Sequence, residues 1–153
     1  MDYADRQVQA FLARSMIARI ATVSAKGTPQ LMPLWFVARD GRIYMNNAAT
    51  SPTVRNIAGS PDVVLLFDAD RGSQRGTCLR VRGRARFVEG DALLRKMWLR
   101  VAAKHYLSLK GVLGVIRHVS RLSAMRRYYA ERRSSSGVIE VTPLDAEFIP
   151  HPE

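Results

Sequence analysis

The residues best suited to chemistry lie where an apolar segment runs into a helix start, between Asn46 and Asn56. Ser51 followed by Pro52 is typical of a helix N-terminus, because serine caps the first turn and proline has no N–H there that needs a partner. Free N–H groups at such a terminus, with the hydroxyls of Ser51 and Thr53, could bind a phosphate. The alternative is a capped helix without a ligand, which the local sequence alone favours.

Other reactive groups are poorly placed for catalysis. The three histidines, His105, His118 and His151, lack the spacing of a metal site, so we expect no metal. The single cysteine, Cys78, opens a strand-like segment with no serine or histidine pattern beside it. This favours a small, half-buried strand residue over a nucleophile. One cysteine also excludes an internal disulfide and indicates a reducing compartment.

The net charge of +11 is concentrated in one segment. Residues 92–133 carry eleven Lys and Arg but one acid, Glu131, a net of +10, whereas the rest of the chain is nearly neutral at +1. Two interpretations are open. The arginines can face water while an apolar stripe packs on the domain. Alternatively, they form a wall that attracts an anionic ligand, a nucleic acid or a membrane surface.

The length of 153 residues and the hydrophobic content of 47% indicate one globular domain over residues 1–153, with the basic helical segment 92–133 inside it. No apolar run reaches the roughly 18 residues of a membrane span. No secretory signal is visible at the start of the sequence. We therefore expect a cytoplasmic protein with no membrane span.

Hydrophobic periodicity alternates along the chain between the periods of helix and strand. Helices are expected at 3–15, 52–58, 91–106 and about 108–132. Strands are expected at 18–23, 30–38, 42–46, 62–67, 78–88 and 138–141, the last ended by Pro143. The pair Asp40-Gly41 is a strong hairpin signal, because both residues tolerate positive φ. The pattern predicts a mostly β fold with flanking helices, in which six antiparallel strands close into a barrel and leave no free edge.

The strand expected at 78–88 has two faces of opposite character. Its apolar face carries Leu79, Val81, Ala85 and Phe87, with Gly83 among them, and its other face carries Arg80, Arg82, Arg84 and Arg86. Four like charges on one strand face are unfavourable unless they meet solvent, an acid-bearing neighbour or an anionic ligand.

Taken in order, these segments resemble the pyridoxamine 5′-phosphate oxidase-like superfamily, the FMN-binding split barrels. The similar stretches are Ala18 to Pro29, Pro33 to Val37 with Asp40 to Tyr44, Ser51 to Asn56 with Ser60 to Val63, Arg82 to Ala85, and Val138 to Pro143. The chain is more similar to the small flavin- or deazaflavin-binding branch than to the vitamin-synthesising oxidase. The resemblance implies a six-stranded antiparallel split β-barrel and a homodimer. It also implies that FMN or the deazaflavin coenzyme (F-420) lies in a groove between the subunits.

The resemblance also implies which residues border the cofactor. They are Met32, Pro33, Leu34 and Trp35 along the flavin ring, Asn46 and Asn47 at the ring or ribityl chain, Ser51, Pro52 and Thr53 at the phosphate, and Cys78 and Arg80 at the polar edge of the ring. A flavin requires a flat apolar slot and donors to its ring heteroatoms, which such a set could supply.

The chain departs from the oxidase pattern at the positions that supply cations. The oxidase has arginine at Met32, lysine at Val37 and Ser-Arg-Lys where this chain has Ser51-Pro52-Thr53. A charged hydrogen bond is worth about 1.5–3 kcal/mol, so these losses argue against pyridoxamine phosphate oxidation and could weaken FMN binding strongly. Three outcomes are open. The helix terminus holds the phosphate alone, Arg55 or an arginine of segment 107–133 substitutes, or the cofactor has been lost.

We therefore expect a flavin- or deazaflavin-dependent oxidoreductase that transfers a hydride to or from a small organic substrate. No catalytic residue stands out, and the polar candidates Tyr44, Asn47, His105 and Tyr106 are each interpreted as structural. Segment 107–133 could close over the cofactor and attract the anionic tail of a deazaflavin coenzyme. The alternatives are a non-catalytic module that binds flavin, haem or another anion, and a binder of nucleic acid or a membrane surface, with nucleic acid ranked last.

Overall fold

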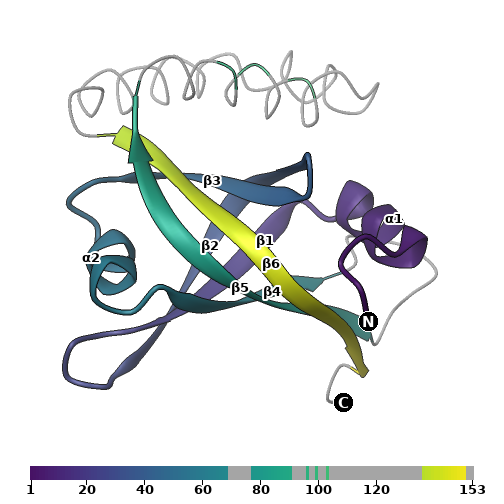
Figure 1. Ribbon diagram of the computed structural model, residues 1–153, viewed down its shortest axis with the longest axis horizontal. Helices are drawn as coiled ribbons and strands as arrows, with labels where there is room; N and C mark the ends of the chain where they lie inside the picture. The colour runs from purple at the N-terminus through teal and green to yellow at the C-terminus, as the bar shows by residue number, and fades with distance from the viewer. Residues whose placement is uncertain (69–76, 91–95, 97–98, 100–102, 104–135, 151–153) are drawn as a thin grey trace, which may run out of the picture.

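A closed barrel of six antiparallel strands forms the body of the protein (Figure 1). The computed structural model describes residues 1–68, 77–90, 96, 99, 103 and 136–150. The strands are β1 Ile17–Val23, β2 Pro29–Arg39, β3 Arg42–Ala48, β4 Asp62–Asp68, β5 Thr77–Glu89 and β6 Ser136–Pro150, and the helices are α1 Arg6–Arg14 and α2 Pro52–Gly59. Around the barrel the order is β1-β2-β3-β6-β5-β4. The predicted fold class is thus confirmed, whereas the helices expected at 91–106 and 108–132 fall almost entirely outside the described residues.

The two helices lie at opposite sides of the barrel (Figure 1). In α1, Asp5 accepts a hydrogen bond from the N–H of Gln7 and so caps the helix, which therefore begins three residues later than the sequence predicted. Its apolar stripe, Val8, Phe11 and Leu12, is buried as expected. The helix therefore covers its side of the barrel with the face that the sequence predicted.

The core fills the barrel with the inward-facing residues of every strand. Its largest fully buried side chains are Phe11, Phe36, Phe67, Leu12, Ile20, Ile43, Met45, Leu65, Leu79 and Ile139. Phe36 and Phe67 meet edge to face with their ring centroids 4.8 Å apart, and Phe11 meets Phe148 in the same way at 5.4 Å.

The last strand differs most from its prediction. β6 continues through Pro143 to Pro150 instead of ending at Val141. Pro143 lies opposite Gly83, where the pairing between β5 and β6 shifts its register. A proline has no N–H to give to the ladder, but the ladder is already interrupted at such a bulge, so the strand can continue.

Acids on β4 and β6 accompany the arginine row of β5, and two of them, Asp145 and Glu147, lie in the part of β6 that follows Pro143. Arg80 pairs with Glu147, Arg82 with Asp145 through its Nε at 2.8 Å, Arg84 with Asp62 at 3.5 Å, and Arg86 with Glu140 at 2.8 Å. The sequence left solvent, an acid-bearing neighbour or an anionic ligand as possible surroundings of these arginines. The structure shows acid-bearing neighbouring strands. The Arg82 guanidinium lowers the pKa of Asp145 through their hydrogen bond. Because each arginine has an acid, this face presents little excess positive charge to a polyanion.

Tyr3 is a buried tyrosine whose hydroxyl has no hydrogen-bond partner in the described part of the chain. The residue is 8% exposed, and burial raises its pKa from 10.0 to about 12, because the phenolate would lose its hydration. The unfolded chain releases this proton near pH 10 and the folded chain near pH 12. Stability is therefore lost as the pH rises through that window.

We expect Tyr3→Phe to reduce this alkaline loss of stability. At pH 7 the variant should be at least as stable as the parent, and up to about 1 kcal/mol more stable, since it removes an unsatisfied buried hydroxyl. Urea unfolding at about pH 8 and pH 11 measures both effects. Equal losses of stability in the two proteins between these pH values would contradict the assignment.

Within the described residues, neither helix has the length and hydropathy needed to cross a lipid bilayer.

Candidate cofactor site

The candidate site lies where β2 and β3 part from each other. The two strands pair only from Phe36 opposite Met45 to Arg39 opposite Arg42. Beyond that point the first half of β2 pairs with β1, while the end of β3 pairs with β6. The chain then turns from β3 into α2, which contacts β1 and β5. Two sets of predicted cofactor residues, on β2 and on β3, therefore lie at the edges of this parting.

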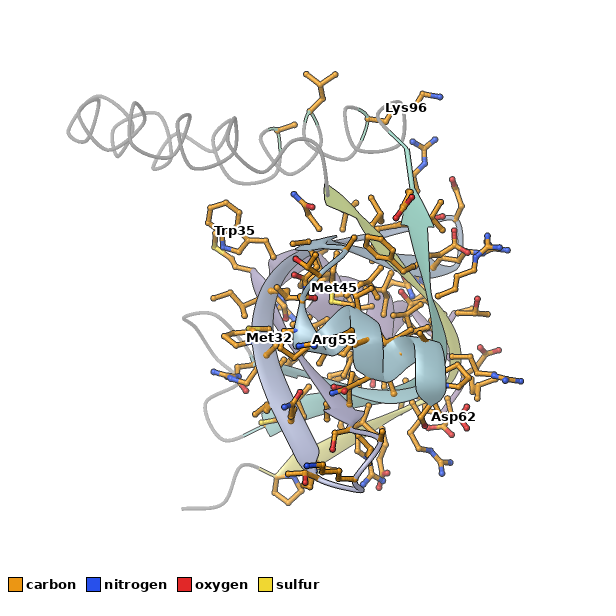
Figure 2. All side chains as sticks on the ribbon, turned by 90° about the vertical axis from the view of Figure 1, so that its left-hand side faces the viewer. Met32, Trp35, Met45, Arg55, Asp62 and Lys96 are labelled. Carbon is orange, nitrogen blue, oxygen red and sulfur yellow. The ribbon has the colours of Figure 1, made fainter. Side chains whose placement is uncertain are left out.

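The apolar run on β2 is accessible on both of its faces. Met32 and Leu34 share the side of the buried Phe36, whereas Pro33 and Trp35 lie on the outer side, because side chains alternate along a strand. Met32 and Trp35 are each 38% exposed although both are large and apolar. Figure 2 shows Trp35 projecting from one edge of the barrel. This run could cover the face of a flat aromatic ligand.

Asn47 has a buried hydrogen-bond donor that finds no partner among the described residues. Its Oδ1 accepts from the N–H of Ala48 at 2.8 Å, but its Nδ2 is buried without a partner. Alternation along β3 places Asn47 on the same side as the core residue Met45, and Asn46 on the outer side. An unpaired buried donor costs about 1–3 kcal/mol, so this amide suits an acceptor atom brought by a ligand. The oxygens of a flavin ring or ribityl chain are such acceptors.

The start of α2 offers a phosphate fewer donors than the sequence suggested. The cap is confirmed, since the Ser51 hydroxyl oxygen accepts from the N–H of Val54 at 3.2 Å and the Ser51 carbonyl accepts from that of Arg55. Pro52 has no N–H, which leaves the N–H of Thr53 without a bond among the described contacts of this turn. The Thr53 side chain is buried, at 3% exposed. A phosphate here would have the Thr53 N–H and the hydroxyl hydrogen of Ser51.

Arg55 is the one cation on α2. Its side chain is exposed, and it lies on the side of the molecule that Figure 2 presents to the viewer. Its guanidinium is therefore accessible to a ligand at this side of the molecule.

Cys78 and Arg80 are not brought to the β2 run within one chain. Around the barrel, β4 and β1 lie between β5 and β2. With strands about 4.8 Å apart, this places Arg80 roughly 14 Å from Pro33 in the same row of the sheet. The Cys78 thiol is buried and donates to Asp68 Oδ1 at 3.4 Å, and burial raises its pKa. The thiol is therefore protonated near neutral pH and poorly suited to nucleophilic chemistry.

A family model described as pyridoxamine 5′-phosphate oxidase matches residues 4–149. The chain belongs to the pyridoxamine 5′-phosphate oxidase family. The family match spans all six strands and both described helices, so the fold and the family agree. No curated protein matches the chain significantly.

Solved structures share the fold of this family member at low identity. A conserved hypothetical protein from Mycobacterium tuberculosis is 18% identical, with a TM-score of 0.70 over 97% of this chain and 85% of the other. An F420 reductase is 18% identical, with a TM-score of 0.64 over 91% and 94% of the two chains. The haem storage protein HutZ from Vibrio cholerae is 16% identical, with a TM-score of 0.59 over 98% and 95%. The same split barrel thus occurs in proteins described by different ligands.

Of the four polar residues that the sequence offered as catalytic candidates, three are not part of this site as described. Tyr44 lies on the outer face of β3, opposite Glu140 of β6. His105, Tyr106 and segment 107–133 fall outside the described residues, as do all three histidines. Among the residues that are described, no group of three His, Cys, Asp or Glu side chains could hold a metal ion.

Asn56 is a buried hydrogen-bonding residue of α2 that reasoning from the sequence missed. It lies inside α2, is buried at 9% exposed, and hydrogen-bonds to side chains of both β1 and β2. A signal was present, because asparagine is unfavourable in a helix interior unless its side chain has a partner. The partners, Thr22 and Gln30, are too far away in sequence for that signal to identify them.

Proposed function

We propose that this protein is a homodimeric oxidoreductase of the cytoplasm that binds FMN or a deazaflavin coenzyme and transfers a hydride to or from a small organic substrate. The observation that carries the proposal is the buried Nδ2 of Asn47, which has no partner among the described residues and lies on β3 where β2 and β3 part, while the other strand of the parting carries the accessible apolar run. Membership of a family that binds FMN supports the choice of ligand. The similarity to an F420 reductase supports the deazaflavin alternative.

An exposed apolar face supports the dimer. Ile17 and Val23 of β1 and Leu31 and Trp35 of β2 are 39%, 43%, 57% and 38% exposed, and alternation places all four on the outer side of the barrel. We call these four residues the outer apolar face. Large apolar side chains gathered on one surface are typical of protein interfaces. A second copy of the chain on this face would bring its own residues to the β2 run.

Each residue of the site has a task that follows from its position. The β2 run from Met32 to Trp35 would exclude water from the face of the ring. Asn47 would donate from Nδ2 to an oxygen of the ring or ribityl chain. The Ser51 hydroxyl, the Thr53 N–H and the Arg55 guanidinium would hold the phosphate. The bound cofactor supplies the hydride chemistry itself, so the protein needs no strong acid or base of its own.

The weak cationic set at the phosphate end favours a deazaflavin coenzyme over FMN. The oxidase pattern has cations where this chain has Met32, Val37, Pro52 and Thr53, and the described residues offer Arg55 in their place. A deazaflavin coenzyme has a polyglutamate tail beyond its phosphate. The eleven basic residues of segment 92–133 could attract that tail.

We expect replacement of Asn47 to weaken cofactor binding without weakening the fold. Asn47→Leu and Asn47→Asp both remove the donor, so the Kd for the bound coenzyme should rise about 10- to 100-fold. The apo form of Asn47→Leu should unfold near the temperature of the parent, because the variant loses both the unpaired Nδ2 and the Oδ1 that accepts from the N–H of Ala48. Fluorescence titration with FMN and with the deazaflavin coenzyme measures the Kd, and thermal unfolding of the apoprotein controls for folding.

The same titrations distinguish the competing functions. A bound coenzyme that is bleached by a reduced nicotinamide supports the oxidoreductase. A coenzyme that binds but stays oxidised favours a binding module, as does haem binding in its place, given the similar fold of a haem storage protein. Unchanged affinity in both Asn47 variants would remove the observation on which the site rests.

A further inference from the structure

Asn56 connects the two ends of the proposed cofactor site. Its Nδ2 donates one hydrogen to Thr22 Oγ1 at 3.0 Å and the other to Gln30 Oε1 at 2.8 Å. Thr22 and Gln30 are direct cross-strand partners on β1 and β2. Both amide hydrogens are therefore used, and α2 is tied to two strands at a single point.

The burial of this contact makes it specific. Asn56 is 9% exposed and Thr22 is 2% exposed, so water competes little for either group. Breaking the bond to Thr22 would leave a buried polar group without a partner, which costs more than the bond itself contributes. Gln30 is exposed, so water can compete for its bond. A helix that rotated or slid along the barrel would lose both bonds together, because they converge on one nitrogen.

The hydrogen bonds of Asn56 lie between the phosphate end of the proposed site, at the start of α2, and the ring end, on β2. Ser51 and Arg55, the proposed phosphate ligands, precede Asn56 on α2. Gln30 precedes Met32 by two residues on β2 and shares its side of the strand. The phosphate end and the ring end are thus carried by different elements, and Asn56 is hydrogen-bonded to the strand that carries the ring end.

We propose that Asn56 is a positioning residue that sets the placement of the phosphate-binding turn of α2 relative to the ring-binding run of β2. The inference rests on the proposed function, since it concerns a cofactor with a ring and a phosphate. A purely structural residue would affect the binding of every flavin alike. A positioning residue acts on the phosphate end alone, because the ring end belongs to β2.

The test compares a flavin that has a phosphate with one that lacks it. FMN and riboflavin are titrated into the parent and into Asn56→Leu, and the deazaflavin coenzyme and its phosphate-free core form a second pair. We expect the preference of the parent for the phosphorylated member to fall at least fivefold in Asn56→Leu, while the Kd for the other member changes less than twofold. Thr22→Val should act in the same direction, and Thr22→Ser, which keeps the hydroxyl, should restore the preference.

Gln9→Leu is the matched control. Gln9 lies on α1, and its Nε2 donates to the carbonyl of Tyr3 at 2.6 Å, so this variant also removes a helix amide contact, on the opposite side of the barrel (Figure 1). We expect it to leave the preference unchanged. An unchanged preference in Asn56→Leu, or a parallel loss of both flavins, would overturn the proposal. A parent that binds neither pair would refute the proposed function itself, which is a different result.

Discussion

Leu31→Glu is expected to convert the proposed dimer into monomers and to abolish cofactor binding with it. Leu31 is 57% exposed in the single chain and lies in the outer apolar face. Burying a carboxylate without a partner costs about 2 kcal/mol or more, and a two-fold interface buries it twice. The dimer Kd should therefore rise about 1,000-fold. Sedimentation at micromolar concentration measures the mass, and flavin titration of the same sample measures the binding.

Leu144→Glu is the control for this prediction. Leu144 is 65% exposed, but it lies on β6, which pairs with β3 and β5 and with neither strand of the outer apolar face. The same substitution there should leave the mass and the binding unchanged. A Leu31→Glu protein that stays dimeric would show that the two copies meet on another surface. A monomer that still binds flavin with the parent affinity would show that one chain completes the site.

Gly83→Ala is expected to destabilise the barrel by about 2 kcal/mol, which corresponds to a fall in Tm of roughly 4–8 °C. A Cβ atom at Gly83 would come within 2.7 Å of the Thr142 carbonyl oxygen and 2.8 Å of Val141 Cγ1. The first of these is a backbone atom of the paired strand, so it cannot move unless β5 and β6 separate. Relief by a side-chain rotation is therefore not available.

Gly59→Ala is the matched control for the glycine variant. Gly59 ends α2, its backbone is outside the left-handed region, and an added Cβ would meet nothing within 4 Å. This variant should be as stable as the parent or more stable by about 0.4–1 kcal/mol, because alanine restricts the unfolded chain. Thermal and urea unfolding of the three proteins test both expectations. Equal stability of Gly83→Ala and the parent would mean that the bulge opens without cost.

The strands could be predicted where turn residues or apolar alternation within the strand itself indicate them. The Asp40-Gly41 turn has both residues at positive φ, at 50° and 73°, as the hairpin pattern requires. The two faces of β5 follow directly from its alternation. The continuation of β6 beyond Pro143 was not predictable, because it depends on a bulge opposite Gly83. A bulge is a property of two paired strands, and the sequence of one strand does not reveal it.

The candidate site was predictable only in part, for the same kind of reason. The Ser51 cap is local, and it is confirmed by the bond to the N–H of Val54. The remaining assignments came from the family resemblance, and the cofactor contacts of these residues stay predictions. The structure adds an unpaired donor at Asn47 and a buried link at Asn56, both of which depend on neighbours distant in sequence.

The resemblance of its segments to a known family indicated the family. The sequence by itself determined the number and type of the described elements and the location of the excess charge in residues 92–133. Each of these depends on periodicity, turn residues or composition, which are local properties. Only the tertiary structure decided that the arginines of β5 meet acids, that β2 pairs with β3 from Phe36 onward but not before it, and that α2 is tied to both β1 and β2. These features depend on how strands far apart in sequence are paired, and the closure of the barrel sets that pairing.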